Sequence, residues 1–373
     1  MAQIDVYVDP DATGSGTGDD WNNAYNSLNA AEAARHGDYV TDTDNIVYHL
    51  RSSGGTKDTT AVIFNGSTTN SVYDIRIIQE DDNYILQAAN TNVLTLSDAF
   101  ITITKLQVEL TATNANYQKA LYVDGLPSGS VTNLDKLTLK GANNNSYRER
   151  CFSCDNGRTV NIYNSVIYNT NAVDGSIANS LIHNGGSTLN IYNCTISTGR
   201  NGAYLPLGTT KAVNCIFANI ISVLGSGSWT NSDYNASDLG ITTGGSNDII
   251  NATFEFVDSA NGDFHLTSGD SSGAKDGGTD DPASGLYDDD KDGNLRVSPW
   301  DMGAYEYILV TYIGESPIII DNKNNIKLIG NNASDFDPET NGMNGLNYSR
   351  GVDKKIGNSF NTISSQIKKI RIT

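Results

Sequence analysis

The sequence predicts an all-β solenoid, in which short strands coil one above another, for most of its 373 residues. A short phrase returns along the chain: residues 160–167 read VNIYNSVI, residues 189–196 read LNIYNCTI, and residues 212–217 read AVNCIF. The two full copies start 29 residues apart, a period typical of solenoids. The composition agrees: 38% of the residues are hydrophobic and 36 are Gly, as expected for coils that bury one narrow stripe and form many turns.

Residues 1–40 are predicted to form a strand and a capping helix. Residues 4–9 alternate between apolar and polar side chains, as a strand does. A helix is expected over residues 22–36, capped by Asn22 or Asn23 and ended by Gly37. Its apolar face would consist of Trp21, Tyr25, Leu28 and Ala31. Such a helix would cover the unpaired strand edges at the open end of the solenoid.

Residues 41–307 are predicted to form the coils and a loop-rich closure. Strands are expected at 45–50, 61–65, 74–78, 85–88, 93–96, 100–110, 120–123 and 131–139, and then in the repeats from 160 to 224. Asn recurs in the repeated phrase, and two interpretations of it stay open. It forms an internal ladder of stacked amides, or it takes the left-handed backbone conformation that turns the chain between strands.

Residues 308–373 are predicted to form a separate C-terminal segment, with strands at 308–313, 317–321 and 326–329. They hold 8 Lys/Arg and 6 Asp/Glu, whereas residues 1–307 hold 16 and 37. The chain ends in a basic stretch, and Lys368, Lys369 and Arg371 are its candidate attachment residues. The change in charge predicts a segment with its own partner, for attachment or oligomerisation.

The formal charge of −19 disfavours nucleic acid and anionic membranes as partners. No run of about 18 apolar residues is present, so no membrane insertion is expected. The N-terminal residues MAQIDV lack the basic and apolar regions of a signal peptide, which predicts that the protein is assembled in the cytoplasm.

Both ends of the first 307 residues resemble a known family. Residues 7–25, YVDPDATGSGTGDDWNNAY, resemble the opening of right-handed parallel β-helix proteins of bacteria and phages, of the pectate-lyase-like and choice-of-anchor Q types. The closing stretches DFHL at 263–266, DGNLR at 292–296 and DMGAYE at 301–306 are similar to the same family. The resemblance implies a right-handed single-stranded parallel β-helix over residues 1–307, and its motifs are specific for fold rather than for activity.

That family contains secreted surface proteins, polysaccharide-active enzymes and phage virion proteins. Because the chain shows no signal peptide, the resemblance implies a non-enzymatic structural protein of a phage virion surface, such as a capsid decoration protein, a fibre or a tailspike-like adhesin. Its partners would be other virion proteins of the capsid or tail and host surface polysaccharide, and by analogy it would form a homo-oligomer such as a trimer. Two alternatives stay open: a polysaccharide lyase or glycoside hydrolase acting on bacterial surface polysaccharide, and a bacterial cell-surface adhesin.

The one candidate cofactor is calcium. The loop DDDKDG at 288–293 places Asp288, Asp290 and Asp292 at alternate positions before a Gly, a spacing that can bring carboxylate oxygens together around Ca²⁺. Pro stands at the twelfth position of this loop, where an EF-hand has Glu. The alternative interpretation is an acidic surface turn in which Asp292 or Asp301 pairs with Arg296.

No catalytic residue is assigned from the sequence. The most regular stretch, 156–232, has only four charged residues: Arg158, Asp174, Arg200 and Lys211. A glycosidase or lyase needs a defined pair or cluster of ionisable groups. Nothing in the sequence selects such a pair from the acidic residues of the earlier coils, which are Asp74, Glu80, Asp81, Asp124, Asp135 and Glu149.

The remaining chemically reactive residue types are given structural interpretations. The four Cys are predicted to be structural thiols, the alternative being a redox or zinc half-site at Cys151 and Cys154. The four His share no metal spacing and no Ser or Asp partner pattern, so each is predicted to be structural. The 19 Tyr are equally expected as strand residues and as exposed platforms for sugar rings.

Overall fold

The computed structural model describes residues 2–112, 118–124, 129–142, 150–155, 157–169, 180–308, 310–313, 316–320 and 326–328. The chain divides into two compact units, residues 1–307 and 308–373. The division falls where the charge changes along the sequence.

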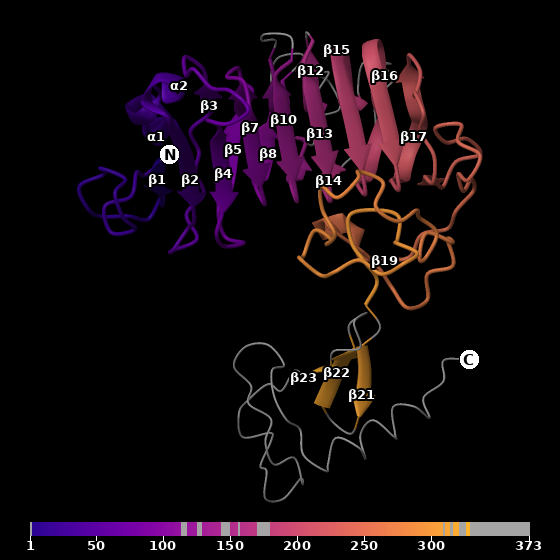
Figure 1. Ribbon diagram of the computed structural model, residues 1–373. Helices are drawn as coiled ribbons and strands as arrows, with labels where there is room; N and C mark the ends of the chain where they lie inside the picture. The colour runs from indigo at the N-terminus through magenta and orange to yellow at the C-terminus, as the bar shows by residue number, and fades with distance from the viewer. Residues whose placement is uncertain are drawn as a thin grey trace, which may run out of the picture. The chain divides into compact units, whose positions relative to one another are not determined.

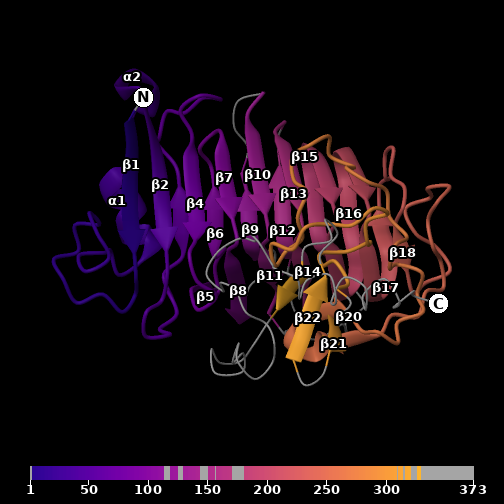
Figure 2. The same cartoon turned by 60° about the horizontal axis from the view of Figure 1, so that its bottom comes forward.

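The first unit is mostly β and is built on one large sheet of 18 strands, which pair in parallel (Figures 1 and 2). This architecture agrees with the predicted all-β parallel solenoid. After the first three strands, successive strands go in turn to three stacks, which we call A, B and C, so that each strand pairs with one from the previous coil. Parallel neighbours in such a stack lie about 4.8 Å apart.

Stack A begins the chain and continues through the repeated phrase. It contains β1 (Ala2–Val8), β2 (Asp44–Leu50), β4 (Ile75–Gln79), β7 (Ile101–Thr104), β10 (Val131–Asp135), β13 (Thr159–Tyr163) and the ends of β15 (Ser180–Tyr192) and β16 (Thr195–Val213).

Stacks B and C form the other two sides of the coils. Stack B contains β5 (Ile85–Ala89), β8 (Gln107–Ala112), β11 (Thr138–Lys140), β14 (Val166–Tyr168), the start of β16, β17 (Ile216–Ser226) and β18 (Ala236–Ser237). Stack C contains β3 (Val62–Phe64), β6 (Leu94–Leu96), β9 (Lys119–Val123), β12 (Arg150–Asp155), the start of β15, the middle of β16 and the end of β17.

The core is a column of apolar side chains that repeat at one register position per coil. In stack A, one such row is fully buried and consists of Ile77, Ile103, Leu134, Ile162 and Ile191. Burying one side chain of this size contributes roughly 1.5–3 kcal/mol, so the rows supply much of the stability of the coils.

The predicted helix is present but shorter than expected. Helix α1 spans Leu28–Arg35, its N-cap is Ser27 rather than Asn22 or Asn23, and its C-cap is His36. It starts late because Tyr25 is held in an extended bridge beside Val8 of β1. Its buried Leu28 packs within the core cluster of the coils, and a short helix α2 (Tyr39–Asp42) follows.

The two Asn of the repeated phrase have different roles, so each interpretation holds at a different position. The first Asn forms a ladder: Asn161 Nδ2 donates to Asn133 Oδ1 and Asn190 Nδ2 donates to Asn161 Oδ1, both at 2.9 Å. These side chains are half-buried, so the ladder is not internal as predicted. The second Asn turns the chain between stacks A and B in the left-handed conformation, with positive φ at Asn164, Asn193 and Asn214.

Lys105 and Lys136 occupy this same turn position in the two preceding coils and also have positive φ, 58° and 57°. Two predicted strands, 100–110 and 131–139, are therefore each divided into two by a lysine turn. The sequence pattern did not show the break, because left-handed backbone is less common for Lys than for Asn or Gly.

The coils are followed by a segment, residues 256–307, that we call the closure segment. It contains an antiparallel pair, β19 (Phe256–Asp258) and β20 (Asp263–Leu266), joined by the 3₁₀ turn Ser259–Asn261. The second unit contains a three-stranded antiparallel sheet of β21 (Val310–Ile313), β22 (Ser316–Ile320) and β23 (Ile326–Leu328). Within the described residues, no helix has the length and apolar character needed to cross a membrane.

Candidate functional site

The closure segment docks on the row of Asn turns at the corner between stacks A and B. Thr279 exchanges two hydrogen bonds with the side chain of Asn214, at 2.7 and 2.9 Å. Tyr287 donates its hydroxyl to Asn193 Oδ1 at 2.8 Å, and Arg296 donates from Nη2 to Asn164 Oδ1 at 2.9 Å. The second Asn of each repeat therefore serves as a docking point for a distant part of the chain.

A buried ionic cluster organises the closure segment. The Arg296 guanidinium is fully buried and forms an ion pair with Glu306 at 3.4 Å, not with Asp292 or Asp301 as the sequence suggested. Asp301 accepts a hydrogen bond from Arg296 at its backbone carbonyl oxygen. Burial raises the pKa of Asp301 to about 6, and burial followed by the nearby Asp301 raises the pKa of Glu306 to about 7.

The three candidate calcium ligands have separate partners. Asp290 is fully buried and accepts hydrogen bonds from the backbone N–H groups of Asp292, Asn294 and Glu306. Asp292 instead contacts a histidine of the groove described below, and Asp288 is exposed. Among the residues that the structure describes, no group of three or more His, Cys, Asp or Glu is arranged to hold a metal ion.

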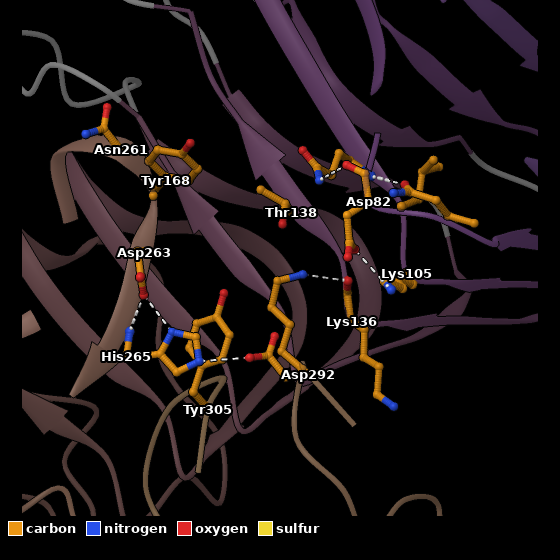
Figure 3. Close-up of a pocket in the computed structure, with 15 residues that line it drawn as sticks. Asp82, Lys105, Lys136, Thr138, Tyr168, Asn261, Asp263, His265, Asp292 and Tyr305 are labelled. Carbon is orange, nitrogen blue, oxygen red and sulfur yellow. Dashed lines mark hydrogen bonds and ion pairs between the residues drawn. The ribbon is translucent and has the colours of Figure 1, made fainter. Parts of the chain in front are cut away.

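A groove with a volume of about 330 Å³ lies where the closure segment ends against the earlier coils (Figure 3). Turns that follow β4, β7 and β10 line one side of it, and residues from 261–265, 291–292 and 305 of the closure segment line the other. We call this feature the groove. It occurs where lysine takes the place of the turn asparagine.

The two turn lysines of the groove are held by ion pairs of different strength. Lys136 Nζ lies 2.6 Å from Asp289, and both side chains are largely buried. Lys105 Nζ lies 3.0 Å from Asp82, whose side chain is 79% exposed. Exposed pairs of this kind contribute at most about 1 kcal/mol, so Lys105 can exchange its partner readily.

His265 is held between two carboxylates on the closure-segment side, as Figure 3 shows. Its Nδ1 is 2.6 Å from Asp263 and its Nε2 is 2.9 Å from Asp292. Burial alone would lower the pKa of His265, but the hydrogen bonds to Asp292 and Asp263 raise it to about 9. The imidazole is therefore charged at neutral pH, and its ring lies 3.8 Å from that of Tyr305.

Lys291 joins the two sides of the groove. Its Nζ donates a 2.7 Å hydrogen bond to the carbonyl oxygen of Lys136. Burial lowers the pKa of Lys291 to about 8, while Asp292 opposes the shift. Its ammonium group is thus a partly desolvated charge on the wall of the groove.

These side chains favour binding over acid–base catalysis. Both nitrogens of His265 donate to carboxylates, so the ring has no free lone pair to accept a proton. The aromatic rings of Tyr168 and Tyr305, with ammonium groups and carboxylates beside them, can instead hold a polar ligand through hydrogen bonds and ring contacts.

The earlier acidic residues are engaged individually. Asp74 pairs with Arg76, Glu80 with His49, Asp81 accepts from the backbone of Asn83 and Tyr84, Asp124 accepts from Tyr122, and Asp135 accepts from Asn164. Glu149 lies outside the described residues, as do the candidate attachment residues Lys368, Lys369 and Arg371.

The structure also brings together a Ser, a His and an Asp that the sequence did not associate. Ser153 Oγ lies 3.0 Å from His183 Nδ1, and Asp155 lies 3.7 Å from the same nitrogen. A catalytic triad needs the hydroxyl and the carboxylate on opposite nitrogens, and here Ser153 is fully buried. We therefore interpret these residues as part of the packing of stack C. All four Cys are buried free thiols, as predicted.

Sequence reasoning missed the groove. The closing motifs DFHL and DGNLR contain His265 and Asp292, but nothing in the sequence shows that these two residues face each other. Lys105 and Lys136 could be found only by aligning each coil on its turn position.

The chain matches no family model, no curated protein and no solved structure. The fold defines the class, a mostly β protein built on a large parallel sheet, and the function is inferred from the chemistry of the groove.

Proposed function

We propose that this protein is a non-enzymatic, glycan-binding structural protein of a phage virion surface. The observation that carries the proposal is the groove: it is preformed at a corner of the coils, and its histidine and two of its lysines are already paired with carboxylates. A virion adhesin needs this combination of a stiff body and a polar binding surface.

The lining of the groove supports a sugar ligand. Sugar rings present hydroxyl groups at their edges and C–H groups on their faces, so they suit sites that combine hydrogen-bonding side chains with aromatic rings. Tyr168 and Tyr305 supply the rings, while Thr138, Gln107 and Asp82 supply polar groups. Because Tyr168, Thr138 and Gln107 lie on paired strands, binding requires little ordering of these side chains.

The pairing of the ionisable groups supports binding without cleavage. An inverting glycosidase needs a protonated acid and a carboxylate base on opposite sides of a bond. In the groove, Asp263 and Asp292 are both bound to the same imidazole, and the hydrogen bond from His265 lowers the pKa of Asp292, so Asp292 is not suited to act as the protonated acid.

The phage setting rests on the resemblance of residues 1–307 and on the charge of the chain. The first unit carries 16 Lys/Arg and 37 Asp/Glu, whereas residues 308–373 carry 8 and 6. In this proposal the acidic coils project and the near-neutral second unit docks to the capsid or tail. The coils wind right-handed, as parallel crossovers almost always do, and α1 covers the N-terminal end of the coils.

A binding and depolymerisation assay tests the glycan proposal. Immobilised full-length protein is exposed to purified capsular polysaccharides and lipopolysaccharides, and the same samples are sized by chromatography after incubation. Binding with no change in polymer length is expected. Shortened polymer would favour the lyase or hydrolase, and a lack of binding to every glycan would overturn the proposal.

The virion setting needs its own measurement. Mass spectrometry of purified particles, followed by immunogold labelling of intact ones, should find the protein on the particle surface. Its detection only in a bacterial envelope fraction would favour the cell-surface adhesin.

A further inference from the structure

The charges of the groove differ from those of the protein around it. Its lining contains four cationic side chains, Lys105, Lys136, His265 and Lys291, and three carboxylates, Asp82, Asp263 and Asp292. Residues 1–307 as a whole carry 16 Lys/Arg against 37 Asp/Glu. An anion is therefore repelled by most of the first unit but not by the groove.

We infer that the groove selects acidic glycans, and that an anionic substituent of the sugar is bound by the ammonium groups of Lys291 and Lys105. This inference rests on the proposed glycan-binding function. It names the chemical class of the ligand and the two side chains that recognise it.

Lys291 has hydrogen-bonding capacity to spare. An ammonium group has three N–H donors, and among the described residues one acceptor is recorded for this one, the carbonyl oxygen of Lys136. A half-buried ammonium with unused donors is stabilised by any acceptor that enters the groove. A carboxylate or phosphate is the best such acceptor, because charge-assisted hydrogen bonds are about twice as strong as neutral ones.

Lys105 is the second available cation. Lys105 and Lys291 both line the groove, so an anion bound there lies near two positive charges. The carboxylates of Asp292, Asp135 and Asp82 are also close enough to Lys291 to act on its pKa, so the anion competes with them for the ammonium group. The pair of Lys105 with the exposed Asp82 is weak and can open for a ligand, whereas the more buried pair of Lys136 with Asp289 fixes the turn.

The carboxylates of the groove do not oppose an anion as strongly as their number suggests. Asp263 and Asp292 are both hydrogen-bonded to His265, which carries a positive charge at neutral pH. Their oxygens are thereby partly neutralised and are directed at the imidazole. Lys105 on the coil side and Lys291 on the closure-segment side are consequently the cations available to an anion in the groove.

The test compares each acidic glycan with a neutral copy of itself. Oligosaccharides of alginate, hyaluronan and polysialic acid are each titrated into the full-length protein by calorimetry, beside the same oligosaccharides after reduction of their carboxyl groups. We expect at least one acidic form to bind ten-fold or more tightly than its reduced form. The affinity of that form should also fall as NaCl is raised from 50 to 300 mM.

Variants connect the selectivity to the lysines. Lys291→Met and Lys105→Met should each weaken binding of the acidic form about ten-fold and should bring its affinity close to that of the reduced form, while Lys291→Arg should retain most of the affinity and the selectivity. Lys211→Met, outside the groove, is the matched control. Equal melting temperatures of the variants would show that the fold is retained.

The outcomes separate this inference from the proposed function. Equal binding of acidic and reduced forms would overturn acidic selectivity but leave glycan binding intact. Selectivity that survives both Met substitutions would overturn the role of the lysines. Binding of no glycan in either form would overturn both proposals.

Discussion

Lys291 Nζ donates a hydrogen bond of 2.7 Å to the carbonyl oxygen of Lys136, across 155 residues of sequence. This bond joins the closure segment to the turn of an early coil at the edge of the groove. The closure segment is thus more than a terminal loop. It covers the turns of the late coils, and where it stops it forms one wall of the candidate binding site.

Arg296 is predicted to be essential for the closure segment. Arg296→Met leaves Glu306 buried without its ion pair, which typically costs 3–5 kcal/mol. Chemical denaturation should show that the unfolding free energy falls by about this amount. The double variant Arg296→Met, Glu306→Gln removes both charges and should recover part of it; a double variant less stable than the single one would contradict the ion-pair explanation.

The turn asparagines are predicted to contribute both conformation and hydrogen bonds. Asn193→Ala places a less suitable residue at a φ of 48° and removes the acceptor of Tyr287, for a loss of about 2–3 kcal/mol. Gly adopts this left-handed backbone conformation readily, so Asn193→Gly should lower the unfolding free energy by about 1 kcal/mol less than Asn193→Ala. Asn161→Ala, which removes only a half-buried ladder bond, is the control and should lose about 1 kcal/mol. Equal losses for Ala and Gly at position 193 would show that the left-handed backbone costs nothing there.

His265 is predicted to make the unfolding free energy fall at alkaline pH. Its pKa of about 9 in the folded protein exceeds its ordinary value of about 6.5, so its stabilising effect is complete below pH 6.5 and is lost as the pH rises through 9. The site is partly exposed, so we expect about 1 kcal/mol. The difference in unfolding free energy between the protein and His265→Gln should shrink from pH 6 to pH 10, and a constant difference would contradict the charged imidazole.

The repeated apolar rows are predicted to hold the coils together. Ile162 is fully buried in the stack A row, and Ile162→Ala should lower the unfolding free energy by about 2–5 kcal/mol. Ile63 on β3 is 50% exposed, and Ile63→Ala should change the unfolding free energy by less than about 0.5 kcal/mol. Similar effects at both positions would mean that the coil interior is not the main source of stability.

The two units are predicted to be separable. Because residues 1–307 form a compact unit of their own, removing 308–373 should leave their cooperative melting transition within about 2 °C of that of the full chain. Circular dichroism during heating measures this. A broadened transition would show that the second unit stabilises the coils, and unchanged attachment of the truncated protein to particles would contradict its proposed docking role.

Much of the fold could be predicted from local patterns. The period of 29 residues between VNIYNSVI and LNIYNCTI is the register in which β13 pairs with β15, where Asn161 lies beside Asn190. Apolar and polar side chains alternate along each strand. The apolar side chains of neighbouring coils stack only when the strands pair in one register, so the alternation predicts that register. The helix was predicted too long because its first residues are drawn into an extended bridge with β1, which is a tertiary contact.

The site was less accessible to sequence reasoning. The Asp288, Asp290 and Asp292 spacing suggested calcium, but in the structure Asp290 is occupied by backbone N–H donors and Asp292 by His265. Which groups occupy a carboxylate depends on the path of the chain around it, and spacing alone does not determine that path.

The sequence by itself determined the parallel coils, their period and the boundary near residue 307, because each depends on short-range periodicity or on charge composition. Tertiary structure alone decided which turns the closure segment covers and which it leaves open. Asn164, Asn193 and Asn214 offer side-chain amides that donate and accept, so the segment binds to them. At the same turn Lys136 still binds the segment, through Asp289 and Lys291, whereas Lys105 pairs with Asp82 of the coils, and the groove lies at these two turns.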